Sequence, residues 1–88
     1  MENRHPFYQS VYTRYCGPTN SRGSRILVTM DKGYDKVVRY TASYDYAAHD
    51  AHDAAIEKFA EIHLPEGWHC VGKGHSPKGY VYLFAWGE

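Results

Sequence analysis

The sequence has few cysteines, no long apolar run and no excess charge of either sign, and each absence excludes a class of protein. The two cysteines among its 88 residues, Cys16 and Cys70, lack Cys-x-x-Cys spacing, which excludes a disulfide framework and a zinc ribbon. No apolar run approaches the ~20 residues of a membrane helix, and the polar N-terminus has no signal-peptide core, so we expect a cytosolic protein that does not bind membranes. The 10 basic and 10 acidic residues balance, which excludes binding to polyanions through overall positive charge.

Motifs for catalysis and for cofactor binding are also missing. The glycine-rich segments match neither a Walker loop nor a Rossmann fingerprint. His69 and Cys70 are neighbours on an expected strand, so they point to opposite faces and cannot act as base and nucleophile. His49, His52 and Asp53 have helical spacing for metal ligands but no fourth ligand at a matching distance, which favours a buried His52 instead. We therefore expect no enzymatic activity, no cofactor and no metal.

The pattern of apolar residues predicts one α+β domain over residues 1–88, with residues 1–6 flexible. Period-2 alternation predicts strands over 7–15, 24–30, 35–41, 68–71 and 80–86, and a period of 3.6 predicts a helix over 47–63. Ser43 or Asp45 is expected to cap the helix, and Pro65 and Gly67 to end it. The order β-β-β-α-β-β predicts a single sheet of about five strands with the helix packed on one face. A right-handed crossover would then make the strands on either side of the helix parallel.

The predicted helix carries an acidic stripe. Asp50, Asp53, Glu57 and Glu61 recur at steps of three and four residues, and residues 41–66 carry six acids and one Lys. By charge complementarity the stripe could occupy a basic nucleic-acid groove on a target protein. The alternative is an ordinary solvated helix face.

The last predicted strand has two apolar faces. One consists of Tyr80, Tyr82, Phe84 and Trp86, and the other of Val81, Leu83 and Ala85. Since one helix covers one face, we expect the aliphatic side chains to contact the helix and the aromatic face to meet a partner protein, a second copy of the chain or nucleic-acid bases. The alternative is that the N-terminal segment folds over the aromatic face.

Basic residues surround two predicted loops. Arg14, Arg22 and Arg25 lie in or beside the loop 17–23, and Lys73 and Lys78 lie in the loop 72–79. Chain direction places both loops at the helix N-terminus, where backbone N–H groups and the helix dipole favour an anion such as a nucleic-acid phosphate. The alternative is that the arginines pair with the helix acids of the same molecule.

The segment Thr13–Arg25 (TRYCGPTNSRGSR) resembles the opening T-K-Y-x-G/P-x-T-N-x-R-G-S/A-R of a family of small phage, plasmid and prophage proteins. The likeness continues in Tyr44-Asp45-Tyr46, His52, Gly67-Trp68 and Gly79-Tyr80-Val81, and the chain departs in an extra Leu64-Pro65-Glu66. The resemblance implies an origin in a mobile element. Small proteins of such elements often inhibit host defence, as anti-CRISPR proteins do, and by analogy the partner would be a host protein or ribonucleoprotein complex in the host cytoplasm.

Our leading hypothesis from the sequence is therefore a non-enzymatic binding protein that inhibits or modulates a host defence complex. The alternative is a small accessory protein that binds nucleic acid through the basic loops and exposed aromatic residues. A homodimer that uses the aromatic strand face is a third possibility.

Overall fold

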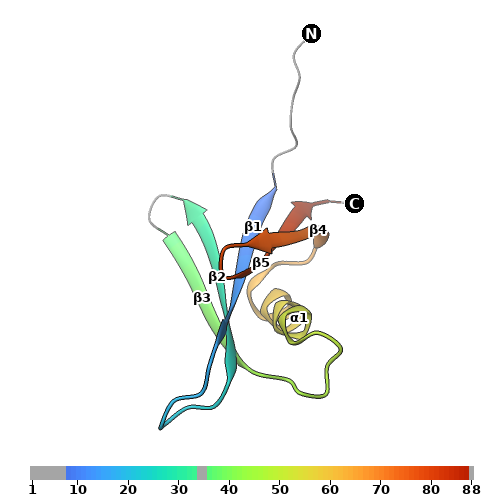
Figure 1. The fold of residues 1–88 in the computed structure, drawn as a ribbon. Coiled ribbons are helices and arrows are strands. Elements are labelled where there is room, and N and C mark those ends of the chain that lie inside the picture. Colours follow the sequence, from blue (N-terminus) through green and yellow to red (C-terminus); the bar gives the residue numbers. More distant parts are fainter. Residues whose placement is uncertain (1–7, 34–35, 88) are drawn as a thin grey trace.

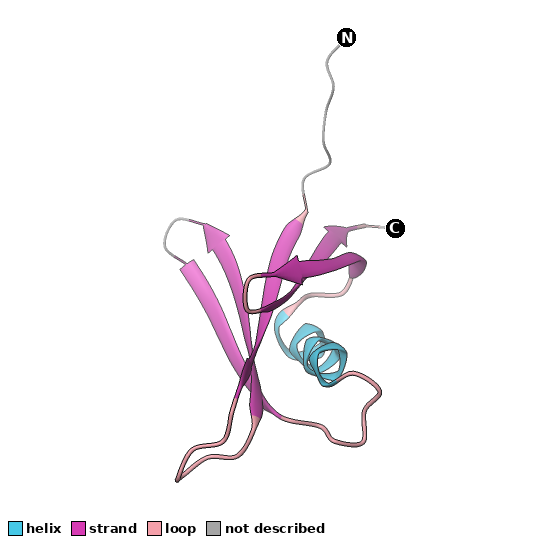
Figure 2. Ribbon diagram, viewed as in Figure 1, coloured by secondary structure: helices cyan, strands magenta, loops and turns pink. Residues whose placement is uncertain are grey.

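The computed structural model describes residues 8–33 and 36–87, so the predicted flexible segment 1–6 lies outside the described residues. Within them, five strands and one helix follow one another in the predicted order (Figures 1 and 2). They are β1 (Gln9–Cys16), β2 (Arg25–Gly33), β3 (Lys36–Ser43), α1 (Ala51–His63), β4 (Trp68–Ser76) and β5 (Gly79–Trp86). The α+β class with one five-stranded sheet and one helix between β3 and β4 is confirmed.

The strands form a single sheet in the order β3-β2-β1-β5-β4, and every neighbouring pair is antiparallel. β3 and β4 run in the same direction, as predicted, but they do not pair with each other, because they form the opposite edges of the sheet. β5 is the more apolar strand of the β4–β5 hairpin, and it takes the inner position beside β1. The helical connection therefore spans the whole width of the sheet before β4 begins.

The hydrophobic core lies between α1 and one face of the sheet, and Figure 1 shows the helix on that side of the strands. Alternate residues of the central strands point into it, among them Val11 of β1 and Ile26 and Val28 of β2. Phe59 of the helix is fully buried against them, and burial of such a side chain contributes about 1.5–3 kcal/mol. The other buried hydrophobic residues are Met30, Ala42, Ala51, Ala55, Ile56, Tyr82 and Phe84.

The orientation of β5 is the reverse of the predicted one. Tyr82 and Phe84 are each only 3% exposed and belong to the core, so the aromatic face of this strand contacts the helix. Tyr82 is the register partner of Val11, and directly opposed residues of paired strands point to the same face. Bulky rings fill the space between the sheet and a single helix, whereas the aliphatic face is left on the other side. Trp86, at the end of the strand, remains 65% exposed.

Asp50 caps the helix, so neither Ser43 nor Asp45 has the predicted role. The Asp50 carboxylate accepts hydrogen bonds from the backbone N–H groups of His52 at 2.8 Å and of Asp53 at 3.3 Å. These bonds satisfy two of the donors that a helix N-terminus leaves unpaired.

The predicted loop 72–79 is mostly strand. β4 continues to Ser76 and pairs with β5, and the two are joined by the short turn of Pro77 and Lys78. The turn packs closely on β1: a Cβ atom on Gly79 would come within 2.0 Å of the carbonyl oxygen of Thr13. Only glycine permits this approach.

No helix in the described part of the chain is both long and apolar enough to cross a membrane. The two cysteines are not joined: Cys16 is half-buried and Cys70 is exposed.

Candidate nucleic-acid interface

The sheet face that points away from α1 is the open face. Strand alternation and register place on it Tyr12 and Arg14 of β1, Arg25, Leu27 and Thr29 of β2, Arg39 and Thr41 of β3, and Val81 and Leu83 of β5. Among the described residues, the only helix lies on the opposite face, so no second layer covers this one (Figure 1). The side chains of the open face are therefore available to a ligand.

The open face is basic. Arg14, Arg25 and Arg39 come from three adjacent strands. Among the residues that the structure describes, the acid that shares the face with them is Asp31, near the far end of β2. Most acids of the helical segment lie on the other side of the molecule. The arginines and most of these acids thus lie in two different layers, although the net charge is zero. Such an arrangement gives one surface a positive potential.

A hollow of about 410 Å³ opens on this face between β1, β2 and the β4–β5 turn. It is lined by Tyr12, Thr13, Arg14, Leu27, Thr29, Ser76, Pro77 and Lys78. Arg14 is the register partner of Gly79, so Lys78 in the turn is brought beside Arg14. The hollow therefore combines an aromatic ring, an apolar side chain and two cations. The two cations are Arg14 and Lys78, which were expected to lie near each other.

Arg25 has a structural role as well as a charge. Its Nη1 donates to the carbonyl oxygens of Gly23 at 3.2 Å and Gly17 at 3.4 Å, which ties the two ends of the loop together. Thr19 Oγ1 accepts a hydrogen bond from the backbone N–H of Arg22 at 3.1 Å inside the same loop. An ordered loop thus presents the exposed Arg22 side chain at the end of the sheet.

Lys73 does not join this site, contrary to the prediction. It is the register partner of Tyr82 and therefore points toward the helix. Its Nζ lies 2.8 Å from Asp53 Oδ1 and 3.2 Å from Asp50 Oδ2, and 4.4 Å from the centre of the Tyr80 ring. The hydrogen bond to Asp53 raises the pKa of Lys73 above its ordinary value. The lysine thus neutralises helix acids instead of offering a charge to a ligand.

The same contacts change the role of the acidic stripe. Asp53 Oδ1 also accepts a 2.5 Å hydrogen bond from the Tyr82 hydroxyl, and burial together with this bond raises the pKa of Tyr82 well above its ordinary value. Burial alone would raise the pKa of Asp50, but its hydrogen bonds outweigh that effect and lower it. Half of the predicted stripe is therefore used inside the molecule, and Glu57 and Glu61 remain exposed.

In the described residues the helix acids pair with Lys73, and no ion pair to Arg14, Arg22, Arg25 or Arg39 is found there. The alternative in which the arginines of the basic loops pair with the helix acids is thus not what the structure contains. Those guanidinium groups remain on the open face and the loop beside it.

His52 lies at the start of the helix, half-buried against the sheet. A hydrogen bond of 2.7 Å joins its Nδ1 to Oγ1 of the buried Thr13, and the Tyr80 ring meets it edge-on. Burial lowers the pKa of His52, and the nearby Asp50 offsets part of this effect. Among the described residues, no three His, Cys, Asp or Glu side chains gather as metal ligands do.

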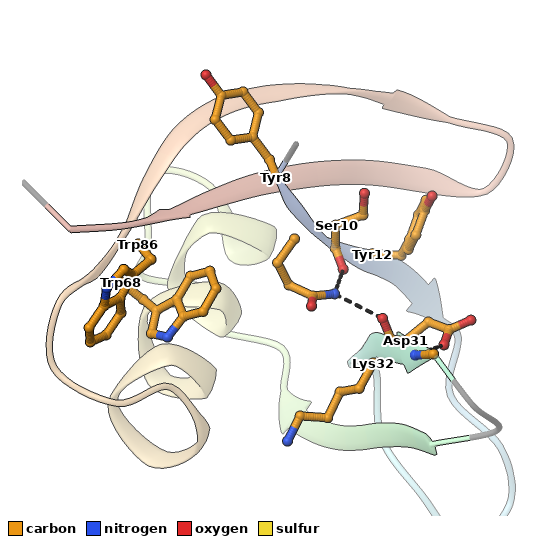
Figure 3. A pocket seen from close by; sticks show the side chains of 9 residues that line it. Tyr8, Ser10, Tyr12, Asp31, Lys32, Trp68 and Trp86 are labelled. Atoms are coloured by element: carbon orange, nitrogen blue, oxygen red, sulfur yellow. Dashed lines mark hydrogen bonds between the residues drawn. The ribbon is translucent and has the colours of Figure 1, made fainter. Parts of the chain in front are cut away.

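A second and wider hollow lies at the opposite end of the sheet (Figure 3). It measures about 640 Å³, and its walls include Tyr8, Tyr12, Trp68 and Trp86. The two indole rings meet nearly edge to face at 5.8 Å. The Gln9 amide donates to the carbonyl oxygens of Ser10 and Asp31, which fixes the floor between β1 and β2. The cations that define the basic part of the open face are not among its lining residues.

Sequence reasoning missed the exposed aromatic residue and one of the arginines of the open face, Tyr12 and Arg39. Each alternates with buried or half-buried neighbours, so strand periodicity was a usable signal. The signal becomes informative only once the face covered by the helix is known.

Comparison of the chain with protein-family models, with curated proteins and with solved structures finds no match. Function is therefore inferred from the residues of the open face.

Proposed function

We propose that this protein binds single-stranded nucleic acid on the open face of its sheet. The observation that carries the proposal is the exposed Tyr12 ring, 43% accessible, on a face that also presents Arg14, Arg25 and Arg39. Tyr12 stacks on a base, and the guanidinium groups, with Arg22 and Lys78 at one end, contact phosphates. This is the accessory nucleic-acid-binding role suggested by the basic loops and exposed aromatic residues of the sequence.

The chemistry of the face supports an extended single strand. Arginine binds phosphate through paired hydrogen bonds, and an aromatic ring on a strand contributes about 1–3 kcal/mol per stacked base without demanding a particular base. A base inside a duplex has no face free for such a ring, so an unstacked strand is the better ligand. Leu27 and Val81, which are half-buried on the same face, add apolar contact beside Tyr12.

Inhibition of a host defence complex stays a prediction. Tyr82 and Phe84, expected at its interface, lie in the core, and Asp50 and Asp53 are engaged by Lys73. Of the four aromatic residues on which a homodimer was predicted, Tyr82 and Phe84 are buried and Trp86 is exposed, and the homodimer also stays a prediction. An origin in a mobile element and a place in the host cytoplasm also stay predictions.

Fluorescence anisotropy with labelled oligo-dT and oligo-U of about 15 nucleotides tests the proposal. The logarithm of the affinity should fall linearly with the logarithm of salt concentration, and Arg14→Ala or Arg39→Ala should each reduce the slope by about 0.7. Tyr12→Ala should weaken binding about tenfold or more, with little change in slope.

Lys58→Ala is the matched control, because Lys58 is an exposed cation on the helix, behind the sheet. It removes the same charge and should leave the affinity close to that of the unmodified protein. The proposal is wrong if no binding occurs at low salt, or if Lys58→Ala weakens binding as much as Arg14→Ala does. Preference for a duplex of the same sequence would also contradict it.

A further inference from the structure

Three tyrosines surround a hollow of about 390 Å³ on the helix side of the sheet, outside the open face. This tyrosine pocket is lined by Tyr15, Ser24, Tyr44, Tyr46 and His52. Its members come from β1, from the residue before β2, from the β3–α1 connection and from the first turn of α1. The fold brings these four segments together in one place.

The rings form walls at steep angles to one another. Tyr15 and Tyr44 meet edge to face at 88° with ring centres 5.7 Å apart, and Tyr44 and Tyr46 lie 4.8 Å apart at 46°. The Tyr15 hydroxyl shares a 3.0 Å hydrogen bond with Ser24 Oγ, which holds that ring in place. Even so, Tyr46 is 80% exposed and Tyr15 about half exposed. Flat apolar surface is thus held in position without being covered.

The remaining wall of the tyrosine pocket is a neutral imidazole. Nδ1 of His52 is hydrogen-bonded to the Thr13 hydroxyl, and the other ring nitrogen has no hydrogen-bond partner among the residues that the structure describes. Burial keeps the pKa of His52 low, so the ring is uncharged near neutral pH. No lysine, arginine or carboxylate lines the pocket. Its chemistry suits a flat, uncharged ring that can form one hydrogen bond.

Basic groups lie next to this pocket. Ser24 also lines a shallow hollow formed by Ser21, Arg22, Gly23, Arg25, Thr41 and Ser43. The two hollows share Ser24, so Arg22 and Arg25 line a hollow that adjoins the tyrosine pocket. Guanidinium groups of this kind bind phosphate, such as one attached to a base in the pocket.

We infer that the tyrosine pocket receives one unstacked nucleobase of the same strand whose phosphates Arg22 and Arg25 contact. This inference rests on the proposed function: the strand runs along the open face and passes the loop 17–24, and one base turns to the helix side. Stacking between aromatic walls is tolerant of base identity, whereas the single hydrogen bond to His52 favours some bases over others.

Photocrosslinking tests the inference separately from the proposed function. An oligo-dT that carries 5-iododeoxyuridine is irradiated with the protein, and the modified residues are mapped by mass spectrometry. We expect adducts on Tyr12 and on at least one of Tyr15, Tyr44 and Tyr46. Adducts on Tyr12 alone overturn the inference and leave the proposed function standing. Absence of binding at low salt overturns both.

Affinity measurements give a second readout. Tyr46→Ala should weaken binding of the same oligonucleotide about tenfold, and Tyr46→Phe should restore most of it, because the stacking surface returns. Tyr46 is so exposed that its removal should leave the fold intact, which circular dichroism checks. Trp86→Ala is the control for loss of an exposed aromatic ring at the other end of the sheet. Equal affinity of Tyr46→Ala and the unmodified protein overturns the inference.

Discussion

The hydrogen bond between Tyr82 and Asp53 offers a quantitative test of how the helix is held on the sheet. Tyr82 is 3% exposed, and its hydroxyl donates to a carboxylate that also binds Lys73. In Asp53→Ala the part-buried Tyr82 hydroxyl loses its acceptor, and Lys73 keeps only Asp50. In Tyr82→Phe the hydroxyl donor is removed, so no polar group is left without a partner, and Asp53 keeps its ion pair with Lys73.

The two substitutions should therefore have different costs. An unsatisfied buried polar group costs about 1–3 kcal/mol, whereas a hydrogen bond that is removed with its donor costs about 0.5–1.5 kcal/mol. We expect Asp53→Ala to lower the free energy of unfolding by about 2 kcal/mol and Tyr82→Phe by about 1 kcal/mol. The exposed ion pair with Lys73 adds little, since such pairs contribute about 0–1 kcal/mol.

Urea unfolding followed by circular dichroism measures these values, and the double variant completes a thermodynamic cycle. Tyr82→Phe removes the hydroxyl that would have no acceptor in Asp53→Ala. The double variant should therefore be about 1 kcal/mol more stable than the sum of the two single losses predicts. Glu57→Ala, which removes an exposed acid from the same helix, should change stability by less than about 0.5 kcal/mol. Strict additivity of the two variants would show that the bond does not form in solution.

Two further predictions concern backbone packing and pH. Gly79→Ala should lower the free energy of unfolding in urea by about 1–3 kcal/mol or more, because the new Cβ atom meets the Thr13 carbonyl. Gly23→Ala is the control and should be close to neutral, because its Cβ atom meets nothing within 4 Å. Equal stabilities of the two variants would disprove the close approach. The pKa of His52 is lower in the folded protein than its ordinary 6.5, so the unfolded chain binds the proton more tightly, and stability should fall as pH drops below about 6.5. His52→Gln should flatten that part of the stability profile and His49→Gln should not; an unchanged slope in His52→Gln would contradict the assignment.

The order and type of the elements could be predicted from the sequence because they depend on local periodicity. Alternation marks the strands and a period of 3.6 marks the helix. Gly33 ends β2 with a φ of 81°, the left-handed conformation that glycine adopts easily. The end of β4 was missed because Gly72 and Gly74 resemble loop residues when seen alone. Pairing with β5 provides their hydrogen bonds and keeps them in the strand.

The candidate site could be predicted only in part. Arg14, Arg22, Arg25 and Lys78 were expected to gather, and the structure brings them to one end of the open face and its adjoining loop. Lys73 was expected beside them, but its position in β4 turns it to the helix side. One step along a strand reverses the direction of a side chain, so a lysine assigned to a loop cannot be placed on a face.

The sequence by itself determined that β5 has two apolar faces and that one helix must cover one of them. Only the tertiary structure decided which one, because Tyr82 and Phe84 on one face and Val81 and Leu83 on the other are all apolar enough to be buried. The choice depends on the register with β1, where Val11 points to the helix and turns Tyr82 with it. That long-range pairing buries the aromatic side chains and leaves Tyr12 and the arginines on the open face, since strand alternation allows no other arrangement.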